Sequence, residues 1–157
     1  MGTEIERKYL VDAAAWRPQG GGIRFRQGYL STQLERVVRV RIEGGAAKLT
    51  IKGASKGLAR TEFEYPIPVD DAAAMLDHLC EQPLIDKHRH KEVHHGKTWE
   101  IDVFHGDNEG LVVAEIELGS EDEPVRVPAW AVQEVSADPR YFNSNLAGNP
   151  YKSWPRG

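Results

Sequence analysis

Acidic and basic side chains recur at every second position in several segments of this 157-residue chain. Near the start, Glu4, Glu6 and Lys8 are separated by single residues, and Glu115 and Glu117 repeat the spacing much later. Carboxylate oxygens are the ligands that Mg²⁺ and Mn²⁺ prefer, whereas ammonium and guanidinium groups pair with phosphate oxygens. Because a metal and a polyanion are the parts that phosphoryl transfer requires, these residue types indicate chemistry on a phosphorylated compound.

A period of two is the spacing of β-strands, in which alternate side chains share one face. Around Arg39 and Arg41 the intervening residues are Val38, Val40 and Ile42, so one face is charged and the other apolar. Patterns of this kind predict strands over residues 3–11, 23–31, 36–43, 46–52, 60–68, 84–95, 97–104 and 111–118. The Gly44-Gly45 link between two of them is typical of a tight hairpin.

The charges are also sorted by strand. Acids occur in the strands at 3–11, 60–68, 97–104 and 111–118, and their members are Glu4, Glu6, Glu62, Glu64, Glu100, Asp102, Glu115 and Glu117. Bases occur mainly at 36–43, 46–52 and 84–95, and the full set is Lys8, Arg39, Arg41, Lys48, Lys52, Arg60, Lys87 and Arg89. A sheet with one solvated face would explain each strand alone. The sorting favours a closed eight-stranded antiparallel barrel whose charged face lines a channel and whose apolar face points outward.

Helices are predicted to flank this barrel, which gives a mainly β protein of the α+β class. One should begin at Asp70 or Asp71 and end at Cys80, and a short one should follow Pro128. The last is expected to begin at Asp138-Pro139 and to end by residue 148. With no repeat or linker in the sequence, we expect residues 1–157 to form a single domain.

Composition restricts the possible partners. The net charge of −4 argues against general nucleic-acid binding, and the single cysteine, Cys80, excludes a disulfide framework. No apolar run approaches the roughly 20 residues of a membrane helix, and charges begin at residue 4, which argues against a signal peptide. We therefore expect a soluble cytoplasmic protein without a membrane or nucleic-acid partner.

The ordered set of charged segments resembles a known family. Glu4-Ile5-Glu6-Arg7-Lys8 is similar to the ExExK signature of the CYTH superfamily, the triphosphate tunnel metalloenzymes. The resemblance continues through residues 26–30, 39–41, 49–52, 60–64, 99–104 and 114–118. It implies an eight-stranded tunnel that binds a triphosphate with a divalent metal ion.

The resemblance also implies a role for each charged residue. Four carboxylates are expected to bind Mg²⁺ or Mn²⁺: Glu4, Glu6, Glu115 and Glu117. The cations expected to bind phosphate are Lys8, Arg39, Arg41, Lys52, Arg60, Lys87 and Arg89, with Lys48 ranked lower. The supporting acids Glu62, Glu64, Glu100 and Asp102 are expected to hold water, a second metal ion or the arginines.

Several activities share this triphosphate site. The compact length and the likeness to short bacterial members favour hydrolysis of inorganic tripolyphosphate to pyrophosphate and phosphate. The alternatives are a nucleoside or thiamine triphosphatase, or a class IV-type adenylate cyclase. Outside the enzymes, a polyphosphate- or nucleotide-binding module remains open. The ligand is in each case a small molecule, and a homodimer is possible.

A proton relay is predicted beyond the motif match. Tyr29 follows Gly28, which can permit a close backbone approach or a bulge, and Lys52 ends a strand beside the glycine-rich loop at 53–59. An ammonium group near a phenol lowers the pKa of that phenol. Tyr29 and Lys52 are therefore predicted to form a catalytic acid–base pair; otherwise Tyr29 only packs and Lys52 only holds phosphate.

Overall fold

The computed structural model describes residues 2–155. Its strands are β1 (Gly2–Val11), β2 (Ile23–Ser31), β3 (Val37–Glu43), β4 (Ala46–Lys52), β5 (Ala59–Ile67), β6 (Ile85–His94), β7 (Lys97–Phe104), β8 (Val112–Glu117) and β9 (Ala131–Glu134). Its α-helices are α1 (Val69–His78) and α2 (Asn143–Gly148), and short 3₁₀ turns cover Gly106–Asn108, Pro139–Tyr141 and Tyr151–Ser153.

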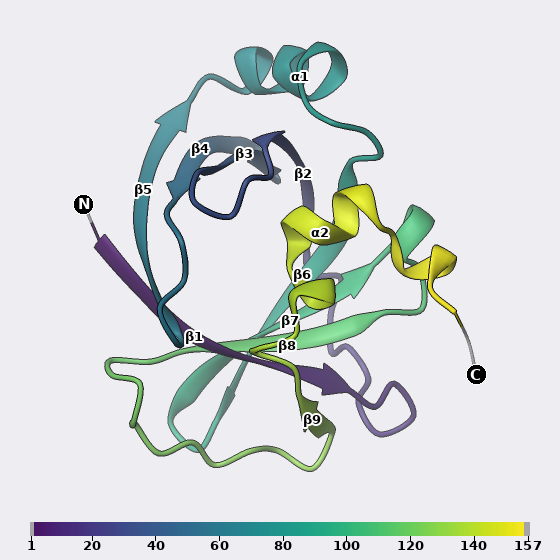
Figure 1. Ribbon diagram of the computed structural model, residues 1–157. Helices are drawn as coiled ribbons and strands as arrows, with labels where there is room; N and C mark the ends of the chain where they lie inside the picture. The colour runs from purple at the N-terminus through teal and green to yellow at the C-terminus, as the bar shows by residue number, and fades with distance from the viewer. Residues whose placement is uncertain (1, 156–157) are drawn as a thin grey trace.

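The first strand closes the sheet into a barrel. The hydrogen-bonded order is β5-β4-β3-β2-β6-β7-β8-β1-β9, and β1 also pairs with β5. Residues 2–5 of β1 pair with β5 and residues 6–10 pair with β8, so β1 joins the two ends of the sheet. Figure 1 looks into the resulting ring. The predicted eight-stranded antiparallel barrel is confirmed, with β9 as an additional strand on the end of β1.

The tight turns lie where glycine was expected. Gly44 has a φ of 57° between β3 and β4, and this positive φ is accessible to glycine at little cost. His95 and Gly96 have φ values of 54° and 77° between β6 and β7, which makes a second tight hairpin. These turns fix the registers of β3 with β4 and of β6 with β7, and the registers decide which charges face the inside.

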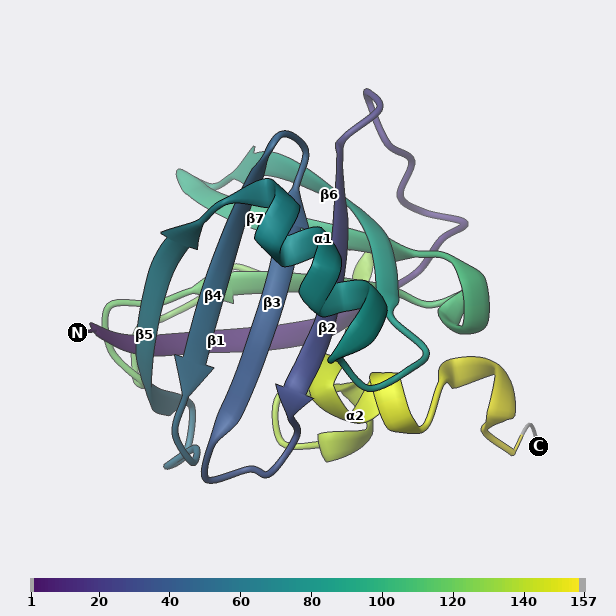
Figure 2. The ribbon, with the colours of Figure 1, turned by 90° about the horizontal axis from the view of Figure 1, so that it is seen from above.

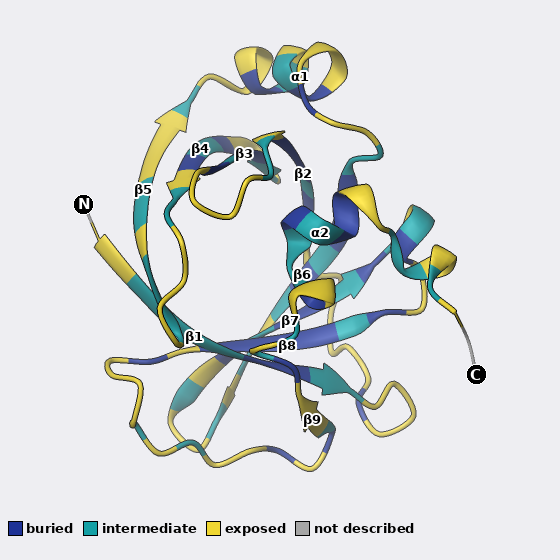
Figure 3. Ribbon diagram, in the orientation of Figure 1, coloured by how far each residue is buried: buried dark blue, intermediate teal, exposed yellow. Residues whose placement is uncertain are grey.

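Two hydrophobic clusters lie outside the barrel, whereas a third, which includes Leu146 of α2, also contains Tyr29 and Val37 of the cavity wall. One cluster packs under Trp16 and Trp130 against the outer side of β1, β7 and β8. A second lies between α1 and the outer side of β3 and β4, where Leu76 is fully buried, and Figure 2 shows α1 crossing these strands. Buried positions alternate with partly buried ones along the first half of β6, whereas residues 113–116 of β8 are all buried, as Figure 3 shows. Burial of the apolar face stabilises the barrel while the other face is left for charges.

Gly28 serves the packing of α1. A Cβ at this position would lie 2.7 Å from Leu84 Cδ2 and 2.8 Å from Cys80 Cβ, so the close approach expected here is made to the segment after α1. The pairing of β2 with β3 shifts register between Tyr29 and Ser31.

Three helix predictions need correction. The segment after Pro128 is the strand β9 and not a helix, because its backbone pairs with residues 9–11 of β1, which β5 leaves uncovered. The last predicted helix is divided, since Phe142 has extended backbone between the 3₁₀ turn at Pro139 and α2. Asp138 does cap the first part, accepting from the Arg140 N–H. Helix α1 begins earlier than expected, with Pro68 at its N-cap and the two aspartates in its first turn.

Within residues 2–155, no helix combines the length and the apolar character needed to cross a membrane. The cytoplasmic location, the homodimer and the lack of a nucleic-acid partner stay predictions.

Candidate active site

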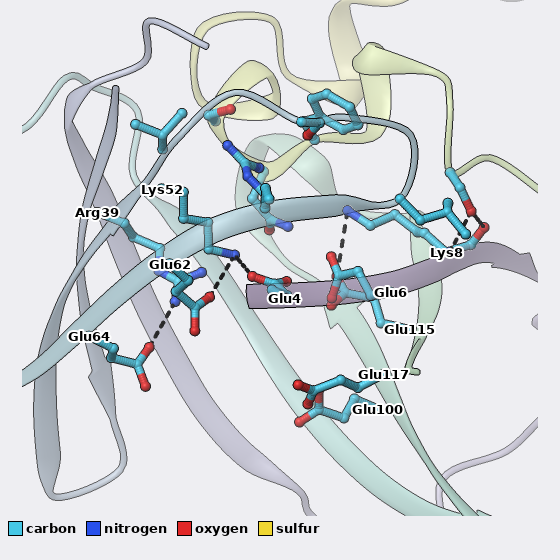
Figure 4. Close-up of a pocket in the computed structure, with 18 of the residues that line it drawn as sticks. Glu4, Glu6, Lys8, Arg39, Lys52, Glu62, Glu64, Glu100, Glu115 and Glu117 are labelled. Carbon is cyan, nitrogen blue, oxygen red and sulfur yellow. Dashed lines mark hydrogen bonds and ion pairs between the residues drawn. The ribbon is translucent and has the colours of Figure 1, made fainter. Parts of the chain in front are cut away.

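The barrel encloses a cavity of about 520 Å³. Its wall includes the four predicted metal ligands Glu4, Glu6, Glu115 and Glu117, and the predicted phosphate ligands Lys8, Arg39, Arg41, Lys52, Arg60, Lys87 and Arg89. Tyr29, Glu62, Glu64 and Glu100 also line it, and Figure 4 shows many of these side chains pointing inward from several strands. Asp102 and Lys48 are the two members of the charged set that do not line the wall. The structure thus brings together residues from almost the whole chain.

The paired ends of β1 and β8 supply one acidic wall. Glu6 lies opposite Glu117 in the register, and Lys8 lies opposite Glu115 with Nζ 3.5 Å from Oε1. Burial, followed by the charges of Glu115 and Glu4, raises the pKa of Glu6 well above its ordinary value. Burial would also raise the pKa of Glu115, but the charges of Lys8 and Arg89 hold it well below its ordinary range. The acids of this wall therefore repel one another, and the neutral form of Glu6 is favoured.

A second carboxylate pair lies where β1 meets β5. Lys52 Nζ is 2.8 Å from Glu4 Oε2 and 3.4 Å from Glu62 Oε2, as the dashed lines in Figure 4 show. A hydrogen bond with Glu4 raises the pKa of Glu62 to about 7. Burial works against ionisation of Glu4, but the bond to Glu62 and the charge of Lys52 lower its pKa well below the ordinary value. Lys52 thus holds two acids together at the cavity wall.

Asp102 organises the cations of β6. It is fully buried and accepts from Lys87 Nζ at 2.8 Å, from Arg89 Nε at 2.8 Å and from Arg89 Nη2 at 2.9 Å. Burial lowers the pKa of Lys87 to about 8, against an ordinary value of 10.5. Asp102 therefore lies behind the cavity wall and orients two of its bases, while its supporting role stays a prediction.

The cations of β3 are less completely paired. Arg39 Nη2 donates to Thr50 Oγ1 at 3.3 Å, and Glu64 accepts from that hydroxyl at 2.9 Å. Arg41 pairs with Glu43, and among residues 2–155 the buried Nε atoms of both arginines have no hydrogen-bond partner. Burial and the charges of Arg39 and Arg89 lower the pKa of Arg41. The guanidinium groups of Arg39 and Arg41 both line the cavity, although the Nε atoms themselves are covered. Lys48, by contrast, binds Glu43 and Glu64 at the rim.

Arg60 holds the loop at residues 53–58. Its Nε and Nη2 donate to the Gly53 carbonyl at 3.2 and 3.0 Å. Ser55, Gly57 and Leu58 of this loop line the cavity. The loop is also attached to the acidic segment, because Glu121 accepts from the Leu58 N–H at 2.6 Å. Arg60 therefore has a structural partner at the cavity wall in addition to the phosphate role that the resemblance implies.

The predicted pair of Tyr29 and Lys52 stays a prediction. Both side chains line the cavity, but within residues 2–155 they contact different polar partners. The Tyr29 hydroxyl accepts from Gln27 Nε2 at 3.0 Å, whereas Lys52 is held by Glu4 and Glu62. Tyr29 also acts on Lys8, because it contributes, after Glu115, Glu6 and Asp102, to raising the pKa of that lysine.

The segment before and within α2 closes one side of the cavity, and sequence analysis missed it. Its lining residues are Ser136, Ala137, Phe142, Asn143 and Ser144. Two phosphate-ligand candidates hold it in place: Lys8 Nζ donates to the Tyr141 carbonyl at 3.0 Å, and Lys87 Nζ donates to Asn143 Oδ1 at 3.1 Å. No charge pattern marks this segment, so only the three-dimensional contacts reveal it.

The carboxylates fit a divalent cation by chemistry. The four candidate ligands supply only oxygen donors, which suit Mg²⁺ and Mn²⁺, and a cation would relieve the repulsion between Glu6 and its acidic neighbours. Within residues 2–155, no three acidic, histidine or cysteine side chains already converge on a common metal position. To hold a metal ion, these side chains would therefore have to move closer to one another.

A closed barrel with a charged interior defines a class of polyanion-binding tunnel proteins, and comparison with known proteins agrees. A model of the CYTH domain matches residues 2–145. An inorganic triphosphatase of Acetivibrio thermocellus is 48% identical over 154 residues, with 98% of this chain and 99% of that protein covered. An inorganic triphosphatase of Nitrosomonas europaea is 37% identical over 151 residues, with 92% and 97% covered. A crystal structure of an inorganic triphosphatase superimposes with a TM-score of 0.66 at 34% identity, with 99% of each chain covered. The chain belongs to the CYTH family.

Proposed function

We propose that this protein hydrolyses inorganic tripolyphosphate to pyrophosphate and phosphate, with Mg²⁺ or Mn²⁺ as the cofactor. The observation that carries the proposal is the cavity itself, in which seven candidate phosphate ligands and four candidate metal ligands face one space of about 520 Å³. The names of the two bacterial relatives support the same substrate.

The chain's own residues would bind and orient the substrate. Arg39 and Arg41 line the cavity, and Arg89 is held rigidly by Asp102, so phosphate oxygens would meet positioned guanidinium groups. A divalent cation on Glu4, Glu6, Glu115 and Glu117 would neutralise phosphate charge and supply an activated water. The enclosing strands would limit access of bulk water and strengthen these electrostatic contacts. Tyr29 and Lys52 remain the proposed acid–base pair.

The proposal is tested by a substrate panel with readouts for phosphate and cyclic AMP. Tripolyphosphate, ATP and thiamine triphosphate are compared at equal concentration with Mg²⁺ and then with Mn²⁺. We expect tripolyphosphate to be cleaved fastest, no cyclic AMP to form, and chelation by EDTA to abolish turnover. Faster release of phosphate from ATP would overturn the substrate assignment, and binding without turnover would identify a binding module.

The metal-ligand assignment is tested by Glu117→Gln. Glu117 lines the cavity, is exposed and forms no ion pair within residues 2–155, so replacing it should leave the fold intact, whereas Glu4 is paired with Lys52. We expect turnover to disappear while the melting temperature is kept. Glu109→Gln is the matched control, because Glu109 is exposed and lies outside the cavity. A Glu117→Gln protein with the original rate at limiting Mg²⁺ would show that this ligand is wrongly assigned.

A further inference from the structure

The inner face of β2 differs from the inner faces of the other barrel strands because it has no charge. Its inward residues are Phe25, Gln27 and Tyr29, whereas Arg24 points outward to Asp86. In the sheet order, β2 lies between β3 and β6, which bear the main guanidinium groups of the cavity. An uncharged strip therefore separates two basic walls.

The ring of Phe25 contacts cations from both walls. The Arg41 Cζ and the Arg89 Cζ each lie 4.8 Å from the ring centroid, and Lys87 Nζ lies 6.0 Å from it. At most twice the 4.8 Å distance therefore separates the two guanidinium carbons. Phe25 is only 5% exposed, so these contacts lie where water screens them little.

The two arginines depend on the ring to different degrees. Arg89 is fixed by two hydrogen bonds to Asp102 and by a third to Glu100 at 3.3 Å. Arg41 has an ion pair with Glu43, and its Nε has no hydrogen-bond partner among the described residues. Burial, followed by repulsion from Arg39 and Arg89, lowers the pKa of Arg41, so its charged form is disfavoured here. The aromatic face is thus one of the few attractive contacts that keep Arg41 in position.

We propose that Phe25 is a positioning residue for polyphosphate binding, whose ring holds Arg41 at a fixed separation from Arg89 so that one bound triphosphate meets both guanidinium groups. This proposal rests on the proposed function, because it takes tripolyphosphate as the ligand. The attraction is that of a cation for the negative face of an aromatic ring, so its strength should follow the electron density of the ring and not only its size. Phe25 itself forms no bond to the substrate.

The first test compares Phe25→Leu with Phe25→Trp by calorimetric titration of tripolyphosphate without metal, alongside turnover with metal. We expect Phe25→Leu to raise Kd and KM by about tenfold, the effect of losing one partly desolvated cation–π contact, and to change kcat by less than about threefold. Phe25→Trp keeps a ring of greater electron density and should retain more of the affinity wherever it folds.

A second test separates electron density from packing. Phenylalanine with one, two or three ring fluorines is incorporated at position 25, which changes the shape little and removes the negative ring face in steps. We expect log Kd to rise steadily with fluorination at a constant melting temperature. In an Arg41→Ala background the same series should have no further effect on Kd, because the ring acts through Arg41. An unchanged Kd across the series in the unmutated protein would overturn the proposal and leave Phe25 as packing.

The two proposals fail in different ways. If the unmutated protein binds tripolyphosphate without cleaving it, the hydrolase function is wrong, while the fluorination series still tests Phe25 through Kd. If the unmutated protein cleaves tripolyphosphate and fluorination changes neither Kd nor KM, the function stands and the role of Phe25 is refuted.

Discussion

Lys87 should make stability and substrate affinity respond to pH in opposite directions. Its ammonium is 1% exposed, and burial lowers its pKa from 10.5 to about 8. The difference corresponds to roughly 3 kcal/mol of cost for keeping this lysine charged in the folded protein at neutral pH. Between pH 8 and pH 10.5 the unfolded chain retains a proton that the folded chain releases. The destabilisation caused by Lys87 therefore decreases, and the free energy of unfolding rises, as pH increases through that window.

Replacement of this lysine tests the argument at fixed pH. Lys87→Met removes the buried charge and keeps most of the volume, but it also removes hydrogen bonds to Asp102 and Asn143. We expect the free energy of unfolding at pH 7 to rise by about 1–2 kcal/mol in urea denaturation, less than the full cost of charging because of the lost bonds. Lys152→Met, at an exposed lysine paired with Asp107, is the matched control and should change stability little.

Whereas Lys87→Met should raise stability, it should weaken the binding of tripolyphosphate. A charged contact to phosphate typically contributes about 1.5–3 kcal/mol, so Lys87→Met should weaken metal-free tripolyphosphate binding by roughly 10- to 100-fold at pH 7. Because only the protonated amine binds the anion, this ratio of Kd values should fall towards one as pH rises above about 8. The ratio cancels the titration of the substrate itself. A ratio that stays constant from pH 7 to pH 9.5, in calorimetric titrations, would refute both the low pKa and the phosphate role.

Two further predictions concern single side chains. Tyr29→Phe removes the hydroxyl that accepts from Gln27 Nε2, so the free energy of unfolding should fall by about 1 kcal/mol. If Tyr29 is an acid–base group, the same change should lower kcat by a factor of about 10² to 10⁴. An unchanged kcat and pH profile would show that Tyr29 only packs. Asp102→Asn leaves two buried cations without their shared anion and should lower the free energy of unfolding by about 3–5 kcal/mol in urea denaturation. Asp77→Asn, at an exposed position of α1, is the control. A loss below about 1 kcal/mol at Asp102 would contradict this account.

The barrel could be predicted from the sequence because its strands are locally encoded. The alternation around Arg39 and Arg41 fixes which side chains face inward, and the turns at Gly44 and Gly96 fix the neighbouring registers. The same alternation placed the charged residues on one wall before their distances were known. The alternation does not show whether a side chain reaches the cavity surface or is buried behind it. Asp102 was therefore grouped with the wall acids, although it lies behind them.

Sequence patterns did not reveal the contacts between segments that are far apart in the chain. The strand β9 forms because the end of β1 has an open edge, and nothing within residues 131–134 shows that this edge exists. The closing segment at 136–144 depends on Lys8 and Lys87, which are far away in sequence. Phe25 lies on the inner face of β2, which has no charge, so the pattern of charged residues gave no sign of its place between two basic strands.

The internal pairing of the cavity explains why a metal–triphosphate complex suits it better than either component alone. Lys52 is bound to Glu4 and Lys8 is bound to Glu115, so candidate phosphate ligands neutralise candidate metal ligands. A polyphosphate arriving alone would draw these lysines away and leave buried carboxylates unpaired, and a metal ion alone would leave buried ammonium groups unpaired. A metal–triphosphate complex replaces each ion pair with two new ones, because its phosphates pair with the lysines and its metal ion pairs with the carboxylates. By thermodynamic linkage, metal and triphosphate must then strengthen each other's binding by the same factor.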